Sequence, residues 1–370
     1  MAAERAECAL VEGWVRQAVR DAQVVDVHTH LFPPQHGELC LWGIDALLTY
    51  HYLCSQCLQT LPASVMTPQR FFELGRSEQA DLVWRRLFVE SSPLSEACRG
   101  VLTTLQRLGL GAELAARDLP AIRAWFARQD PARHVERVFE MARVRYAVMT
   151  NIPTEAREVA AWALPGAPGP HARFKGAVRV DAILQGDWAA LRAGMAAARP
   201  GAALPRAPYE ATVEGARNFL SDWCARIDAV YLMASTPAGF RYLPELKRAY
   251  RSDLVLEYQD ALADEEVPEG ARATELIDKV LVPVAHERRL ALALKVGANR
   301  GLNPELNRCG GGDGVETTNL DFIADLARMN PLLKLLVTVL SRDNQHELAV
   351  TASRFRNVHA YGVWWYCNSP

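Results

Sequence analysis

The second half of the sequence alternates short apolar runs with amphipathic patterns, and this alternation restricts the fold more than any other feature. Apolar strands that alternate with helices are typical of a parallel sheet covered on both faces. The predicted strands are Tyr146–Thr150, Gly176–Asp181, Ala229–Ala234, Leu290–Val296, Leu333–Leu340 and Val358–Trp365. We expect amphipathic helices between them, near 210–227, 270–288, 317–329 and 343–355.

A seventh apolar run, Val24–His30, lies far upstream of the other six. The residues that follow it show only helical spacing, with predicted helices at Thr67–Glu90, Pro93–Leu108, Pro120–Arg128 and Pro131–Arg143. The closed form of such a strand–helix pattern is the (β/α)8 barrel of TIM type. We therefore predict an α/β barrel of residues 1–31 and 144–370, with a helical insertion at 32–143 and the eighth strand apparently missing.

Composition excludes several classes of function. The chain has 370 residues, of which 50% are hydrophobic and 23% charged, and its net charge is −2. A balanced charge without a basic cluster argues against nucleic acid and against an anionic membrane surface as partners. The apolar runs are shorter than the ~20 residues that cross a bilayer. Eight scattered cysteines without an apolar leader segment predict free thiols in the cytoplasm.

The first predicted strand ends in two histidines, His28 and His30. In a parallel barrel, functional side chains lie at the carboxyl ends of the strands. Side chains two residues apart in a strand point to the same face, which Asp26 shares. Two neutral imidazoles in this arrangement can bind one divalent metal ion. The alternative is that both are strand-end side chains hydrogen-bonded to their neighbours.

Several segments together resemble a known family. Residues 26–33, DVHTHLFP, resemble the first-strand signature of the amidohydrolase superfamily. Five further segments resemble the uronate isomerases, in the same order along the chain, and the long helical insertion also fits that family. They are Thr49–Leu53 with its His-Tyr pair, Val178–Asp181, Leu294–Leu306, Leu340–Ala349 and Tyr361–Asn368.

The resemblance implies interconversion of the aldose and ketose forms of a hexuronate. Such a reaction moves a proton between two neighbouring carbons. It therefore needs a positioned base, a cation or metal at the carbonyl and an arginine fork for the carboxylate. By resemblance, His28 and His30 bind a divalent metal, with zinc as the expected ion. The other implied site residues are Tyr52 as a proton carrier and His51, Arg179, Arg300, Trp364 and Trp365 around a small anionic sugar substrate.

Each of these assignments has a structural alternative. His51 and Tyr52 could be packing residues of the insertion, and Arg179 could be a partner in a structural ion pair. The two tryptophans could belong to the core. Asn344 with Glu347 fits an N-cap and its N3 partner at the start of a helix.

The sequence also departs from the family pattern in three places. Lys295 occupies a position where the family has histidine, and a protonated lysine cannot bind metal but can pair with an anion; we expect it to be catalytic. Ala234, Ser235 and Thr236 replace an expected Asp-His element. The resemblance implies an eighth strand with a metal-binding aspartate; we expect this strand to be missing, which would leave two sheet edges unpaired. We expect a fragment, a homo-oligomer or second chain that supplies the strand, or a takeover by Asp26 or Lys295.

Three hypotheses follow from these observations. The first is a metal-assisted isomerase of the uronate type. The second is a metal-dependent hydrolase of the same superfamily, in which a bound water is the nucleophile. The third is a catalytically silent barrel that is retained for binding or assembly.

Overall fold

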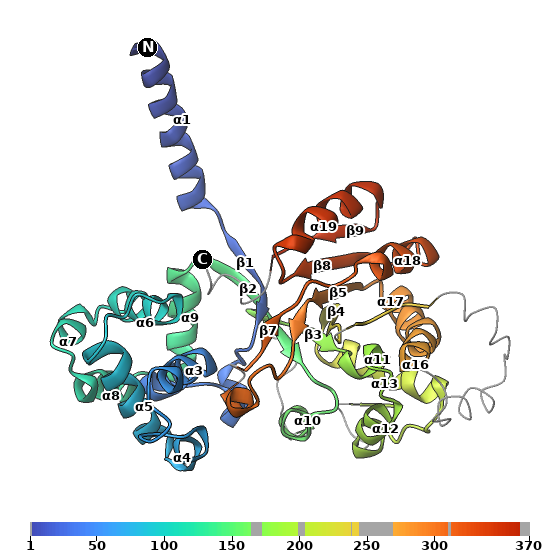
Figure 1. Ribbon diagram of the computed structural model, residues 1–370, viewed down its shortest axis with the longest axis horizontal. Helices are drawn as coiled ribbons and strands as arrows, with labels where there is room; N and C mark the ends of the chain where they lie inside the picture. The colour runs from blue at the N-terminus through green and yellow to red at the C-terminus, as the bar shows by residue number, and fades with distance from the viewer. Residues whose placement is uncertain are drawn as a thin grey trace.

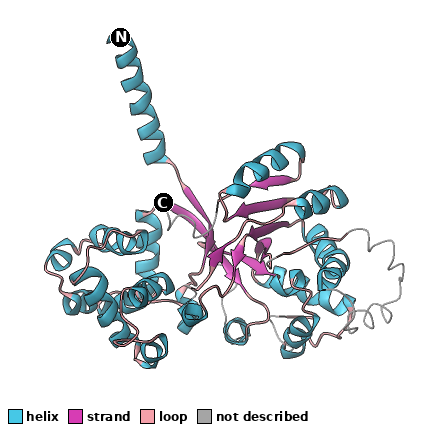
Figure 2. Ribbon diagram, viewed as in Figure 1, coloured by secondary structure: helices cyan, strands magenta, loops and turns pink. Residues whose placement is uncertain are grey.

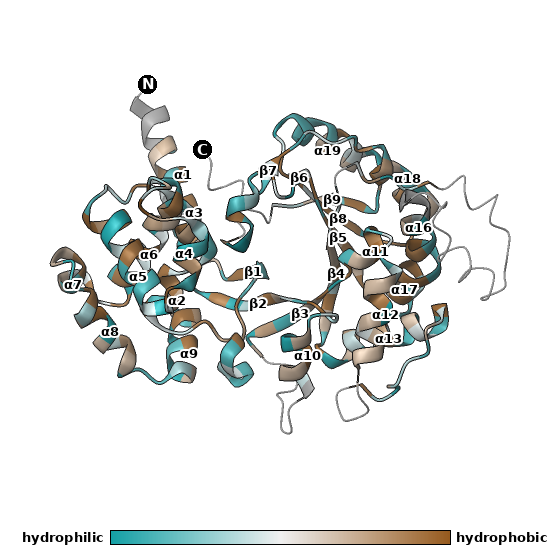
Figure 3. Cartoon of the chain, turned by 60° about the horizontal axis from the view of Figure 1, so that its bottom comes forward, coloured by the Kyte–Doolittle hydropathy of each residue, from teal (hydrophilic) through white to brown (hydrophobic). Residues whose placement is uncertain are grey.

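The computed structural model describes residues 2–163, 172–198, 204–237, 239–243, 269–309 and 312–362. Its centre is a seven-stranded sheet in the order β1-β2-β3-β4-β5-β8-β9, and every neighbouring pair is parallel. The sheet curls into a half-barrel with helices outside it (Figures 1 and 3). The predicted α/β barrel architecture is thus confirmed. The strands are Val24–Thr29 (β1), Val144–Asn151 (β2), Phe174–Arg179 (β3), Ala229–Ser235 (β4), Ala291–Val296 (β5), Leu335–Val339 (β8) and Val358–Ala360 (β9).

Alternation along the strands divides the sheet between two cores. Val148, Ala177, Tyr231, Met233 and Ala293 form a small cluster on the concave face. The residues between them, such as Met149, Val178 and Leu294, belong to a large core beneath the outer helices. These helices are Ala156–Ala163 (α10), Asp181–Leu184 (α11), Trp188–Ala197 (α12), Val213–Arg226 (α13), Glu269–Leu276 (α16), Ile277–Leu281 (η3), Val282–Arg288 (α17), Asp321–Met329 (α18) and Asp343–Arg354 (α19).

The segment between β1 and β2 is helical and has its own hydrophobic core. Figure 2 shows these helices together on one side of the sheet. They are Pro34–Leu39 (η1), Gly43–Leu48 (α2), His51–Gln59 (α3), Pro68–Glu73 (α4), Arg76–Trp84 (α5), Arg85–Val89 (η2), Glu96–Arg107 (α6), Gly111–Ala115 (α7), Leu119–Ala127 (α8) and Pro131–Met141 (α9). As predicted, none of the residues described between 32 and 143 forms a strand.

One predicted helix is two separate helices in the structure, so this prediction is wrong. The expected helix Thr67–Glu90 is broken after α4, where Leu74 and Gly75 are extended. The carboxylate of Glu78 accepts a hydrogen bond from Gly75 N at 2.8 Å, which caps a new helix start. A local capping interaction therefore prevailed over an apolar spacing that continues across the break.

The loop after β5 is part of the core of the insertion. Its short helix Pro304–Cys309 (η4) contributes Leu306 and Cys309 to the cluster that also buries Cys54 and Cys57 of α3. The guanidinium of Arg308 lies 4.9 Å from the ring centre of Phe72 in α4. A two-residue hairpin, Ala298–Asn299 (β6) with Gly314–Val315 (β7), closes the base of this loop. The loop therefore bridges the sheet and the insertion.

The last described segment differs from the prediction in two respects. The strand β9 covers three residues, and Trp364 and Trp365 lie outside the described residues. The helix α19 begins at Asp343, so Asn344 is not its N-cap. Instead, Asn344 is buried. Its Oδ1 accepts a hydrogen bond from Thr318 N at 2.9 Å, and its Nδ2 donates to the carbonyl oxygen of Thr318 at 2.8 Å. Glu347 still accepts a hydrogen bond from Asn344 Nδ2, at 3.2 Å.

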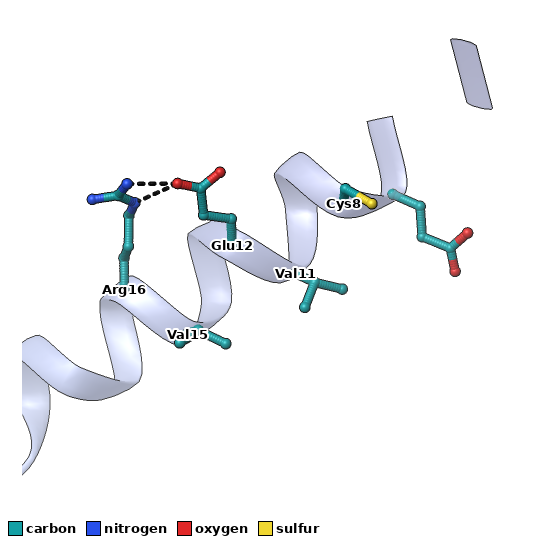
Figure 4. Close-up of a pocket in the computed structure, with 6 residues that line it drawn as sticks. Cys8, Val11, Glu12, Val15 and Arg16 are labelled. Atoms are coloured by element: carbon teal, nitrogen blue, oxygen red, sulfur yellow. Dashed lines mark hydrogen bonds and ion pairs between the residues drawn. The ribbon is translucent and has the colours of Figure 1, made fainter. Parts of the chain in front are cut away.

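The first helix, Ala2–Asp21 (α1), extends away from the body (Figure 1). Its apolar side chains Leu10, Trp14 and Val19 are more than half exposed. Figure 4 shows a pocket whose lining residues all belong to α1, including the ion pair of Glu12 and Arg16. None of the site residues predicted from the sequence lines this pocket. Within the described part of the chain, no helix combines the length and apolarity needed to cross a membrane.

Gly176 in β3 marks a close approach between the sheet and the end of α13. A Cβ built on Gly176 would lie 2.6 Å from side-chain atoms of Ile227 and 2.7 Å from its carbonyl oxygen. We predict that Gly176→Ala destabilises the fold by about 1–3 kcal/mol, because the core must shift to admit a methyl group. Urea unfolding measures this free energy.

Gly100→Ala is the matched control for this substitution. Gly100 is exposed inside α6, and a Cβ there would meet nothing within 4 Å. We expect it to stabilise the protein by about 0.5–1 kcal/mol through helix propensity. Equal effects of the two substitutions would contradict the close packing of β3 on α13.

Candidate active site

The polar side chains of the concave face gather at the carboxyl ends of the strands. In register, Ser235 of β4 pairs with Lys295 of β5, which pairs in turn with Thr338 of β8. Side chains of residues paired in register project from the same face of a sheet. All three therefore point to the concave side, and Arg179 at the end of β3 lies next to them.

Lys295 and the two histidines of β1 form the centre of this site. Lys295 is only 4% exposed, and its Nζ lies 3.3 Å from Nε2 of His28. The rings of His28 and His30 are edge to face, with centres 5.0 Å apart. Nδ1 of His30 lies 3.2 Å from the hydroxyl of Thr150 at the end of β2. Three strands, β1, β2 and β5, thus contribute side chains to the centre of this polar cluster.

Burial and nearby cations keep the imidazoles neutral. Desolvation, followed by the charge of Lys295, lowers the pKa of His28 to about 3 and that of His30 to about 4. By surface accessibility, His28 is half-buried and His30 is exposed. Desolvation also lowers the pKa of Lys295 to about 7, and the neighbouring charge of Arg179 acts in the same direction. The site therefore favours neutral side chains or an incoming negative charge.

Arg179 forms a bidentate ion pair with Asp181. Its Nε and Nη2 donate to the two carboxylate oxygens at 2.8 and 2.7 Å. Asp181 also accepts a hydrogen bond from the backbone N of Ser235 at 3.2 Å, which connects β3 to β4. The structural alternative for Arg179 is thus present in the fold. Because this pair uses one edge of the guanidinium, a substrate contact by Arg179 would use its three remaining N–H groups, two on Nη1 and one on Nη2.

His51 and Tyr52 begin α3 and lie at the insertion side of the site. The ring of His51 is 6.5 Å from that of His30, centre to centre, and 4.1 Å from that of Tyr52. Desolvation lowers the pKa of His51 below its usual value. The first turn of α3 therefore presents aromatic and imidazole side chains beside the strand-end cluster.

Arg300 lies in the loop after β5, with 54% of its side chain accessible. Its Nη1 donates to Asp313, which also accepts a hydrogen bond from Gly301 N at 3.0 Å. Gly297 has a φ of +93°, and a Cβ there would lie 2.9 Å from the carbonyl oxygen of Glu316. This turn therefore requires glycine.

The described residues do not complete a metal site. His28 and His30 are neutral, and Nδ1 of His28 is buried without a hydrogen-bond partner among the described residues, so both can bind metal. A catalytic zinc usually has three protein ligands. No group of three histidine, cysteine or acidic side chains able to hold a metal ion occurs in the ranges that the structure describes. The donor set is therefore two imidazoles beside a lysine.

Sequence reasoning did not assign Thr150, Thr338 or the hydroxyl of Ser235 to the site. All three are buried hydroxyl residues at strand ends. These three residues could have been placed on the concave face only with the register between neighbouring strands, starting from His28 and Lys295. The sequence alone does not give that register. Glu158 was also missed, because it reaches the end of β2 from α10, where its carboxylate accepts hydrogen bonds from Asn151 Nδ2 and Ile152 N at 2.7 and 2.9 Å.

Fold and site together define a parallel α/β barrel-type protein with a strand-end active site. Comparison with solved structures finds a uronate isomerase from Bacillus halodurans C-125 at 34% identity and a TM-score of 0.79, covering 97% of this chain and 76% of that one. The chain belongs to the uronate isomerase family.

Two further structures share the fold at 17% identity. They are a uronate isomerase from Thermotoga maritima, with a TM-score of 0.68 over 96% of this chain and 80% of that one, and a glucuronate isomerase from Caulobacter crescentus, with 0.66 over 94% and 74%. No family model matches the sequence. A search of curated proteins also finds no match.

The metal-binding role of His28 and His30 stays a prediction. We expect His30→Ala to remove a bound divalent ion, because a single imidazole at this place cannot hold it. Elemental analysis of the purified protein, before and after dialysis against zinc, measures the stoichiometry. An unchanged metal content in His30→Ala would exclude His30 as a ligand.

Glu158 predicts a pH dependence of stability. Burial raises the pKa of Glu158 to about 7, although the two N–H groups that bond its carboxylate act to lower it. An unfolded glutamate loses its proton near 4.5, so the folded state binds more protons between pH 4.5 and 7. Stability from this group therefore falls as pH rises through that window, by on the order of 2 kcal/mol.

Glu158→Gln should flatten this dependence. The free energy of unfolding in urea, measured at pH 5 and pH 7, gives the slope for wild type and variant. Equal slopes would show that the carboxyl of Glu158 does not titrate in this window.

Proposed function

We propose that this protein interconverts the aldose and ketose forms of a hexuronate or a related sugar acid. The observation that carries the proposal is the buried side chain of Lys295 between strand ends, with its Nζ 3.3 Å from Nε2 of His28, in a chain of the uronate isomerase family. In its protonated form, a buried lysine is suited to a substrate that develops negative charge during the reaction.

The charge around the site supports an anionic substrate. Arg179 and Arg300 both act on Lys295 electrostatically and lower its pKa, whereas Asp181 acts in the opposite direction. Asp313 takes one nitrogen of Arg300, and the exposed guanidinium has four further N–H groups. We assign the carboxylate of the sugar to Arg300 at the open end of the site. Arg179 is assigned a hydroxyl contact, since its fork already holds Asp181.

The proposed reaction moves one proton from C2 of the aldose to C1. The proton at C2 leaves to a base, and the electron pair forms a C1–C2 double bond while negative charge collects on O1. Lys295 donates a hydrogen bond to O1 and stabilises this enediolate. The base then returns its proton to C1, and the proton of the O2 hydroxyl passes to O1, which gives the ketose. Tyr52 is proposed as a proton carrier, because its ring contacts the ring of His51, which in turn lies beside His30.

A divalent metal remains part of the hypothesis, with zinc as the expected ion. His28 and His30 would be its ligands from this chain. The described residues supply two of the usual three protein ligands, so the steps above use the chain's own side chains. The relatives are isomerases, which favours isomerisation over the hydrolase hypothesis.

Cytoplasmic location and association with another copy or a second chain stay predictions. The first rests on the cysteine pattern. The second rests on the two sheet edges, because β1 and β9 each have one neighbouring strand among the described residues. An unpaired edge exposes backbone donors and acceptors that a further strand would satisfy.

The function is tested by following a hexuronate with proton NMR, where the aldose signals should decrease as ketose signals appear. We predict that Arg300→Ala raises the KM for the hexuronate by about tenfold, the worth of one charge-assisted hydrogen bond. The KM for a neutral aldose should not change, because it has no carboxylate.

Arg192→Ala is the control, since Arg192 is an exposed residue of α12 on the outer layer. We expect its kinetic constants to equal those of the wild type. Cleavage of esters or amides without hexuronate turnover would support the hydrolase hypothesis instead. An equal rise in KM for anionic and neutral sugars would remove Arg300 from carboxylate binding.

A further inference from the structure

Ser235 occupies a central place in the strand-end cluster. It is the last residue of β4, and it pairs in register with Lys295. Its backbone N donates to Asp181, the partner of Arg179. The side chain therefore projects from the concave face between the lysine and the arginine–aspartate pair.

The hydroxyl of Ser235 has no hydrogen-bond partner among the described residues. Its Oγ is buried, and the residue is 7% exposed. The next residue provides a contrast, because Oγ1 of Thr236 donates to the carbonyl oxygen of Lys295 at 3.3 Å. Buried hydroxyl groups in folded proteins are nearly always hydrogen-bonded, to protein or to ordered water. The position of Ser235 thus calls for a polar partner that the described chain does not supply.

We propose that Ser235 is a specificity-determining residue that hydrogen-bonds a non-reacting hydroxyl of the sugar acid, at C3, C4 or C5; this inference rests on the proposed function. A serine hydroxyl both donates and accepts, so it can pair with a sugar hydroxyl while Lys295 binds the reacting oxygen. It is also neutral. The positive charge of Lys295 therefore stays available to the substrate. A carboxylate in place of Ser235 would neutralise that charge.

In the free protein, a single water can occupy the same place. A buried water needs two or more polar partners, and the hydroxyl of Ser235 and the ammonium of Lys295 are suitable ones. A ligand hydroxyl that takes over the hydrogen bonds of such a water loses little affinity, whereas a ligand that lacks the hydroxyl leaves Ser235 unpaired. The site should therefore reject one deoxy sugar acid.

The test is calorimetric binding of a hexuronate and of its 3-deoxy, 4-deoxy and 5-deoxy analogues. Wild type should bind one of the three analogues about tenfold or more weakly than the parent sugar acid. Ser235→Ala should bind that analogue and the parent with equal affinity. Its melting temperature should be no lower than that of the wild type, since the lost hydroxyl has no partner in the described chain.

Ser221→Ala is the matched control. Ser221 is also buried, at 1% exposed, but its hydroxyl donates to Glu287 at 3.1 Å and accepts from Arg288 at 2.7 Å in the outer layer. We expect this variant to melt at a lower temperature and to keep the wild-type preference among the four sugar acids.

Three results would overturn the assignment of Ser235. The first is wild-type protein that binds all three deoxy analogues as tightly as the parent, a result that needs no variant. The second is an unchanged preference in Ser235→Ala. The third is a lower melting temperature with that preference intact, which would indicate a permanent structural water. Wild type that neither binds nor converts the hexuronate would overturn the proposed function as well.

Discussion

The side-chain alternation of a curled parallel sheet is the constraint on which the rest of this structure depends. Because neighbouring strands are in register, Ser235, Lys295 and Thr338 form one row across three strands. The side chains of Val148, Ala177, Tyr231, Met233 and Ala293 fill the same face one layer below this row. Burial above that layer desolvates Lys295 and His28 and lowers the pKa of both. The electrostatics of the site thus follow from the backbone.

Much of the fold could be predicted because its strands are apolar on both faces. Each of the six predicted strands after the first overlaps an observed one, and the ends differ by a few residues. The helical character of the insertion was equally visible in its apolar spacing. The break at Gly75 was not visible, since it depends on the carboxylate of Glu78 returning to the backbone. Asn344 shows the same limit, because its partner Thr318 lies in another loop.

The candidate site was predictable where it is local and hidden where it depends on tertiary contacts. His28 and His30 follow from a strand-end pattern within a single segment. The contact between Lys295 and His28 joins residues far apart in the chain, and only strand order brings them together. The pairing of Arg179 with Asp181 is a two-residue motif, yet the sequence left its role open. The structure adds that this pair also holds the start of the turn after β4, through Ser235 N.

The loop after β5 is attached to two units of the fold. Lys295 and the hairpin at its base belong to the sheet side, whereas Leu306 and Cys309, farther along the loop, belong to the core of the insertion. Arg300 lies between these attachment points. An added or deleted residue in the span 297–305 would either withdraw the apolar pair from its core or displace the guanidinium. The length of this span is therefore under tighter constraint than the identity of most residues within it, and divergence here should proceed by substitution far more readily than by insertion or deletion.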